Sequence, residues 1–208
     1  MTGSTWLTRL YSACDEVLWA VRLNLLWIVF TLAGGVVLGL GPATVAAYTL
    51  ARRHAENETI HNWREFLDVY RREFVRGSLL VLPPAALGTV LAGNYLYFSA
   101  LGPAGEAPRA ATLVALLVLV VITAHLLPLY VRYDLRLPAY LVKASLFALV
   151  RPASTIVLLF VFVAVVYAGA TLPVLALAVG AGAWIQLNTW LCLRFFAENE
   201  ARLHPKGN

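Results

Sequence analysis

The sequence predicts an all-α, polytopic membrane protein, on the strength of three observations. Five apolar runs of about twenty residues alternate with short polar stretches, and a run of that length spans a hydrocarbon core about 30 Å thick. Hydrophobic residues make up 61% of the chain and charged residues 13%, against about 25% charged in an ordinary soluble domain. A helix satisfies its own backbone hydrogen bonds in lipid, so the runs are predicted to be helices. The five predicted spans are residues 18–40, 79–100, 110–131, 153–172 and 174–193.

The polar stretches between these runs leave no room for a second domain. The longest, residues 51–77, is too short to form a catalytic domain of its own. Residues 1–208 are therefore expected to form one transmembrane helical domain.

The basic residues are concentrated in alternate connections, although the net charge of the chain is only +5. Six arginines separate the first two predicted spans, four basic residues separate the third and fourth, and three follow the fifth. Between the second and third spans Arg109 stands alone. Positive residues favour the cytoplasmic side of short loops, so the N-terminus is expected outside the cell and the C-terminus in the cytoplasm. The positive charge is assigned to topology and anionic lipid headgroups, and no nucleic-acid partner is expected.

The first span is preceded and followed by distinctive segments. Residues 5–20 carry apolar side chains at helical spacing, which predicts an N-terminal interfacial helix that runs into the span. The span ends in a glycine-rich stretch, in which Gly35 and Gly39 permit close helix approach and Gly41-Pro42 is predicted to end or kink the helix. Residues 43–53 are then expected to form a shorter helix that leaves the membrane, or a re-entrant segment.

Residues 63–76 predict an amphipathic helix on the cytoplasmic side, because an aromatic stripe opposes a charged face. Such a helix would lie against lipid headgroups or under the bundle, or its stripe would meet a partner protein. The candidate residues for this lipid or partner interface are Trp63, Phe66, Tyr70, Arg71, Arg72 and Phe74.

Prolines and aromatic residues mark the later spans. Pro83 and Pro84 predict a kink near the start of the second span, which ends in an outer aromatic belt at residues 95–98. Pro173 separates the fourth and fifth spans, which would otherwise form one overlong helix.

Polar residues in or near the spans are the candidate cavity residues, since ionisable groups are expensive in lipid and often mark functional sites. A structural role is the alternative for each: Arg22 would reach water or pair with Asp15 or Glu16, and the others would hydrogen-bond to neighbouring helices. The four candidates are Arg22, Asn24, His125 and Asn188.

No catalytic chemistry is predicted. The sequence contains no HExxH, GxSxG or glycine-rich phosphate-binding motif, and no carboxylate pair lies within a predicted span. The spacing of the cysteines and histidines fits no metal site, so no metal is expected. Without catalytic motifs, neither an enzyme nor a cofactor is expected. Cys14 and Cys192 are expected at opposite faces of the membrane, where they would not form a disulfide.

Several short segments resemble the YesL-like family of bacterial integral membrane proteins, a domain of unknown function. They are Asn24-Leu25-Leu26-Trp27, the glycine-rich run into Gly41-Pro42-Ala43-Thr44, Trp63–Phe66, Tyr70–Phe74 and, more weakly, Pro128–Tyr133. Members of this family are often encoded beside carbohydrate ABC importers and glycan-degrading enzymes. The resemblance therefore implies an accessory role in sugar uptake and supplies no catalytic residue.

Three functions of different classes follow as hypotheses. The first is a non-enzymatic accessory component linked to carbohydrate ABC import, with importer subunits as partners. The second is a small stand-alone or homo-oligomeric transporter or channel for a small solute, its path lined by Asn24, His125 and Asn188. The third, an intramembrane enzyme acting on lipid-linked glycans, needs a nucleophile or an acid–base pair that the sequence does not show.

Overall fold

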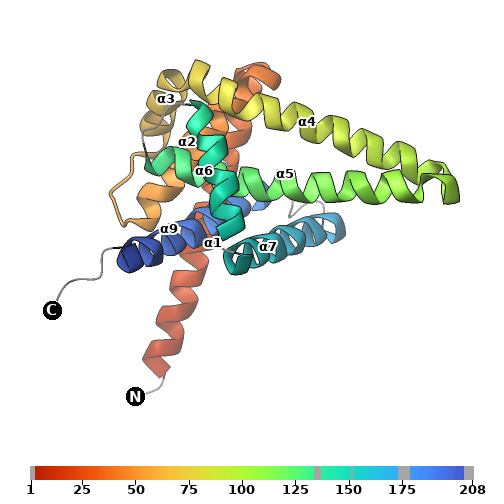
Figure 1. Ribbon diagram of the computed structural model, residues 1–208. Coiled ribbons are helices and arrows are strands. Elements are labelled where there is room, and N and C mark those ends of the chain that lie inside the picture. The colour runs from red at the N-terminus through yellow and green to blue at the C-terminus, as the bar shows by residue number, and fades with distance from the viewer. Residues whose placement is uncertain (1–2, 134–136, 151, 173–178, 204–208) are drawn as a thin grey trace.

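The computed structural model describes residues 3–133, 137–150, 152–172 and 179–203, and within these ranges the chain is helical, with short turns and no strand. The elements, labelled in Figure 1, are α1 (Gly3–Ala33), α2 (Val37–Ala55), α3 (Asn62–Arg72), α4 (Phe74–Ala100), the 3-10 turn η1 (Gly102–Gly105), α5 (Glu106–Arg132), α6 (Leu137–Val150), α7 (Pro152–Thr171) and α9 (Ala181–Leu203).

The first predicted span is shorter than the sequence suggests, because the chain reverses direction at Gly34–Val36. The φ angles of Gly35 and Val36 are 76° and 61°, and this left-handed pair ends α1 at Ala33. α2 then runs back along α1, with the indole nitrogen of Trp27 donating to the hydroxyl of Thr44 at 3.0 Å. Residues 5–20 and the first span are thus one continuous helix, and residues 34–40 belong to the turn and to α2.

Pro42 lies inside α2 and does not end it. A proline has no N–H, so the carbonyl of Leu38, four residues earlier, loses its helical donor. The hydroxyl of Ser78 in α4 donates to the Phe74 carbonyl at 2.6 Å and shares its hydrogen with the Leu38 carbonyl at 3.3 Å. Beside this contact, a Cβ on Gly41 would come within 2.5 Å of the Ser78 Cα. The Gly41-Pro42 pair therefore brings α2 and α4 together, where the sequence predicted a helix end or a kink.

α2 is the centre of the packed region. It contacts α1, α3, α4, α5 and α9, and small side chains along it allow these helices to approach closely. Its buried residues are Gly39, Gly41, Pro42, Ala43, Val45, Ala46, Ala47, Tyr48, Thr49, Leu50 and Ala51. Residues 43–53 thus lie in a second, shorter helix, and most of them are buried in the interior of the fold. That this helix leaves the membrane stays a prediction.

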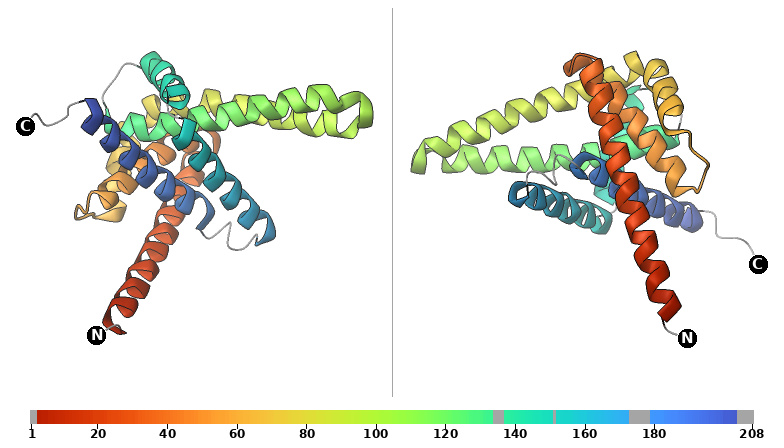
Figure 2. Two further views of the ribbon diagram at one scale, coloured as in Figure 1. Left: turned by 60° about the horizontal axis from the view of Figure 1, so that its bottom comes forward. Right: turned by 180° about the vertical axis from the view of Figure 1, so that it is seen from behind.

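α4 and α5 form a long hairpin that projects from this packed region, closed at its tip by η1, where Gly102 has a φ of 62° (Figures 1 and 2). α4 continues as one helix through Pro83 and Pro84. Few apolar side chains on this hairpin are fully buried, as expected for surfaces that face lipid. α1 runs across the direction of the hairpin in all three views.

Four helical segments of the described chain are long and apolar enough to cross a membrane: residues 13–33, 74–100, 102–132 and 154–171. They correspond to the first four predicted spans. The fifth, residues 174–193, lies partly outside the described residues, and α9, which carries its second half, is not among the four. The chain is therefore a helical membrane protein with several apolar helices, and a count of five spans stays a prediction.

Candidate functional site

Two of the predicted cavity residues join helices far apart in sequence. Asn24 of α1 is buried, and its Oδ1 accepts the backbone N–H of Gly182 in α9 at 3.1 Å. Asn188 of α9 is fully buried, and its amide nitrogen donates to the Tyr48 hydroxyl at 2.8 Å and to the Ala124 carbonyl at 3.1 Å. Hydrogen bonds between helices are a common means of fixing helix packing in membranes. Asn24 and Asn188 therefore act as interhelical pins between α1, α2, α5 and α9.

His125 and Arg22 lie in different surroundings and do not join these two asparagines in one cavity. His125 is 1% exposed, and its Nδ1 is 2.9 Å from the carbonyl of Val121 in the same helix. Arg22 is exposed and borders a shallow, mostly apolar hollow that includes Trp63. Glu16, a predicted partner of Arg22, instead lies 3.3 Å from Nε2 of His54.

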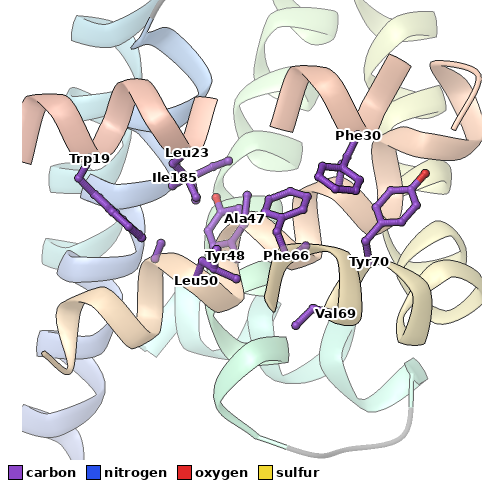
Figure 3. Close-up of a cluster of buried hydrophobic side chains, with 13 residues drawn as sticks. Trp19, Leu23, Phe30, Ala47, Tyr48, Leu50, Phe66, Val69, Tyr70 and Ile185 are labelled. Carbon is purple, nitrogen blue, oxygen red and sulfur yellow. The ribbon is translucent and has the colours of Figure 1, made fainter. Parts of the chain in front are cut away.

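The aromatic stripe of α3 faces the interior of the protein (Figure 3). The rings of Phe66 and Tyr70 lie 4.7 and 5.2 Å from the ring of Phe30 in α1, and both residues are buried. Phe74 is partly buried and continues the stripe at 5.7 Å from Tyr70, whereas Trp63 at the other end is 56% exposed. These aromatic side chains thus pack under the bundle, one of the placements that the sequence allowed, and Phe66 and Tyr70 are not available to lipid or to a partner.

The exposed face of α3 is charged, and it includes Arg71 and Arg72. The start of the helix is held by Glu65, whose carboxylate accepts the His61 backbone N–H at 2.9 Å and receives Arg53 at 2.7 Å. The His61 N–H, followed by the Arg53 guanidinium, holds the pKa of the Glu65 carboxyl below its usual value.

The strongest concentration of charge surrounds a cavity of about 480 Å³ at the base of the α4–α5 hairpin. Its walls come from α2, the α3–α4 junction, α5 and α6, so helices distant in sequence converge here. Five arginines and one glutamate among the lining residues give it a formal charge of +4. The charged lining residues are Arg52, Arg53, Arg72, Glu73, Arg76 and Arg132.

Hydrogen bonds fix the walls of this basic cavity. The Tyr130 hydroxyl of α5 donates to the Glu73 carboxylate at 2.6 Å, and Arg72 lies 3.2 Å from the same carboxyl group. The hydroxyl of Tyr140 in α6 donates to the Tyr133 carbonyl at 2.6 Å. From the sequence, the arginines that line the cavity indicate only membrane topology. Nothing in the sequence indicates that Glu73 and Tyr130, which are 57 residues apart, contact each other.

The described residues show no cluster of three or more histidine, cysteine, aspartate or glutamate side chains that could hold a metal ion. Cys14 is exposed and Cys192 is buried, and both are free thiols.

Comparison with known proteins gives the family of this chain. Residues 20–95 match the family model described as "Protein of unknown function, DUF624". The uncharacterized protein YesV of Bacillus subtilis (strain 168) is 34% identical over 200 residues, which cover 95% of this chain and 96% of YesV. The uncharacterized proteins YesL and YteU of the same organism are 27% and 26% identical, over 70% and 80% of this chain and 69% and 76% of their own lengths. No solved structure matches. With YesV aligned along nearly its whole length, the chain belongs to the YesL-like family of membrane proteins, DUF624.

Proposed function

We propose that this protein is a non-enzymatic accessory component of the bacterial cell membrane that works with a carbohydrate ABC importer. The observation that carries the proposal is that the side chains of Asn24 and Asn188 form hydrogen bonds between helices. A bundle pinned in this way suits a scaffold better than a solute path. The link to carbohydrate import rests on the implication of the family resemblance.

The proposed orientation follows from the position of the arginines. Arg76 at the start of α4 and Arg132 at the end of α5 both lie at the base of the hairpin, while η1 lies at its tip. The positive-inside tendency then puts the base in the cytoplasm and the tip outside. The outer N-terminus and cytoplasmic C-terminus stay predictions of the sequence, because Trp19 stacks on His54 at 4.3 Å and the start of the first span therefore lies beside the end of α2 that carries Arg52 and Arg53.

The charged face of α3 is the proposed contact surface for the importer. Phe66 and Tyr70 anchor the inner face of this helix to α1, so its outer face is presented on a rigid element. Arg64, Asp68 and Arg71 are exposed on that outer face. Charged rims of this kind contribute mainly to partner choice and association rate.

Affinity purification from native membranes in mild detergent, read by mass spectrometry, tests the proposal. Wild-type protein should retain importer subunits, and Arg71→Glu should lose them because the charge of the contact surface is reversed. Arg109→Glu, the same charge change at the far end of α5, is the matched control and should retain them. Recovery of wild-type protein without any importer subunit, from membranes in which the importer is present, would overturn the proposal.

A second candidate function, a small transporter or channel, has one observation in its favour. A cavity of about 560 Å³ lies between α1, α2 and α9, lined in part by Glu16, His54, Gln186 and Trp190. Flux of a labelled monosaccharide into liposomes that contain the purified protein tests this alternative. Flux above that of protein-free liposomes, lost on His54→Ala, would favour the channel over the scaffold.

A further inference from the structure

We propose that the basic cavity at the base of the α4–α5 hairpin is a binding site for a phosphate group. The cavity, about 480 Å³, falls in the size range of small-ligand sites. Guanidinium groups recognise phosphate through paired, charge-assisted hydrogen bonds, which makes arginine the residue expected around such a ligand. Two sources share this chemistry: the headgroup of an anionic phospholipid and a free phosphate in the cytoplasm.

Carboxylates of the described residues pair with two of the arginines around the cavity. Arg53 pairs with Glu65 at 2.7 Å, and Arg72 pairs with Glu73 at 3.2 Å. Glu73 is the one acidic residue among the described residues that line the cavity, and it also accepts the hydroxyl of Tyr130. Arginines held close together repel one another, and an anion between them would relieve that repulsion.

Arg52 supplies a second, independent observation. Its Nε is buried, and no group in the described part of the chain accepts a hydrogen bond from it. A buried donor without an acceptor is destabilising and calls for an explanation such as a bound ion. Because Arg52 lines the cavity, a phosphate oxygen there is a suitable acceptor for this N–H.

Helix dipoles explain why individual arginines lie at helix ends, but they do not explain why these ends meet at one cavity. Arg52, Arg72 and Arg132 lie in the last turns of α2, α3 and α5, where a positive side chain is favoured by the helix dipole. That effect acts on each helix separately. It does not require three C-terminal ends to meet around one hollow, whose tyrosines are held in place by hydrogen bonds. A site built before the ligand arrives costs less ordering when the ligand binds.

An apolar groove lies between α4 and α5, the helices that also carry Arg76 and Tyr130 of the cavity. Its lining includes Leu80 and Leu127, each about one helical turn from those two residues. An acyl chain in this groove would continue from a phosphate in the cavity, which favours the lipid source. Separate probes for the lipid headgroup and for free phosphate distinguish the two sources.

Binding to the full-length protein in mild detergent tests the site with two probes. Inorganic phosphate is titrated against chloride at equal ionic strength, and phosphatidic acid is compared with phosphatidylcholine by native mass spectrometry. At least one of the anionic probes, inorganic phosphate or phosphatidic acid, should bind in preference to its comparator, chloride or the zwitterionic phosphatidylcholine. Arg52→Gln and Arg76→Gln should each weaken that binding by about tenfold, as expected for the loss of a charge-assisted hydrogen bond.

Matched variants separate a built site from general positive charge. Arg64→Gln removes an exposed arginine of α3 that does not line the cavity, and it should leave binding unchanged. Arg52→Lys keeps the charge but loses the planar guanidinium, so its binding should fall between wild type and Arg52→Gln. Preference for phosphatidic acid alone identifies the lipid as the source, and preference for inorganic phosphate alone identifies the free anion. Preference for neither probe, or a loss of binding in Arg64→Gln equal to that in Arg52→Gln, would overturn the proposal. If Arg52→Gln does not fold, Arg76→Gln still tests the site, because Arg76 is exposed.

Discussion

Replacing Asn188 by leucine removes the two hydrogen bonds that its amide donates, and one accepted from the Cys192 thiol at 3.4 Å, from a fully buried position while keeping a side chain of similar size. The Asn188 amide donates to the Tyr48 hydroxyl at 2.8 Å and to the Ala124 carbonyl at 3.1 Å, and Asn188 is 0% exposed. Hydrogen bonds between membrane helices contribute about 0.6 kcal/mol on average and at most about 1.7 kcal/mol. The partners left without a donor or acceptor add a desolvation cost. Asn188→Leu should therefore lower the free energy of unfolding by about 1–3 kcal/mol.

A double-mutant cycle isolates the contact between Asn188 and Tyr48. Tyr48→Phe alone removes the hydroxyl that accepts the Asn188 N–H, and the double variant should be less destabilised than the sum of the two single variants. The expected coupling energy is about 0.6–1.7 kcal/mol. Unfolding by denaturing detergent, followed by intrinsic fluorescence, gives the four free energies. Leu187→Ala, at a 43% exposed neighbour in α9, is the control and should change stability by less than about 0.5 kcal/mol.

The outcome of this cycle also bears on function. If Asn188 instead belonged to a solute path, its replacement would change flux while leaving the unfolding free energy unaltered. A coupling energy of zero, together with wild-type stability of Asn188→Leu, would refute the conclusion that this residue pins α9 to α2 and α5.

Three further predictions concern packing, pH and thiol access. Phe66→Ala should cost about 3–5 kcal/mol in unfolding experiments because the ring is fully buried, and Phe66→Leu should cost less; equal losses would contradict the packing of α3. The pKa of Glu65 is lowered in the fold, mainly by the His61 N–H, so its stabilisation is present above the ordinary glutamate pKa of about 4.3 and is lost as pH falls through the lowered value. The difference in melting temperature between wild type and Glu65→Gln should accordingly shrink in acid, and a constant difference would refute this. A maleimide should label Cys14 in the folded protein and Cys192 only after denaturation; rapid labelling of both would contradict the buried position of Cys192.

Local patterns in the sequence predict most of the helices. The 3.6-residue spacing around Trp63 and Phe66 marks α3 as amphipathic, and this periodicity needs no knowledge of the rest of the chain. It does not tell which environment the aromatic face meets. Phe66 packs on Phe30, more than thirty residues earlier, because α2 returns along α1 and places α3 against it.

Glycine and proline near residue 41 illustrate the same division. Pro42 predicts a break when it is read locally, since a proline removes a hydrogen bond from its own helix. The helix nevertheless continues through Pro42, and the Ser78 hydroxyl, from 40 residues away, lies 3.3 Å from the Leu38 carbonyl. Sequence periodicity contains no information about that partner.

The sequence by itself determined that this chain is apolar, helical and membrane-embedded, and it concentrated the positive charge in alternate connections. These properties depend on run length, hydropathy and spacing, all of which are local. The tertiary structure alone decided that α2 is the buried centre, that Asn188 meets Tyr48 across 140 residues, and that arginines from α2, α3, α4 and α5 surround one cavity. Each of these depends on close contact between segments distant in the chain, and such contacts form only when several helices have packed together.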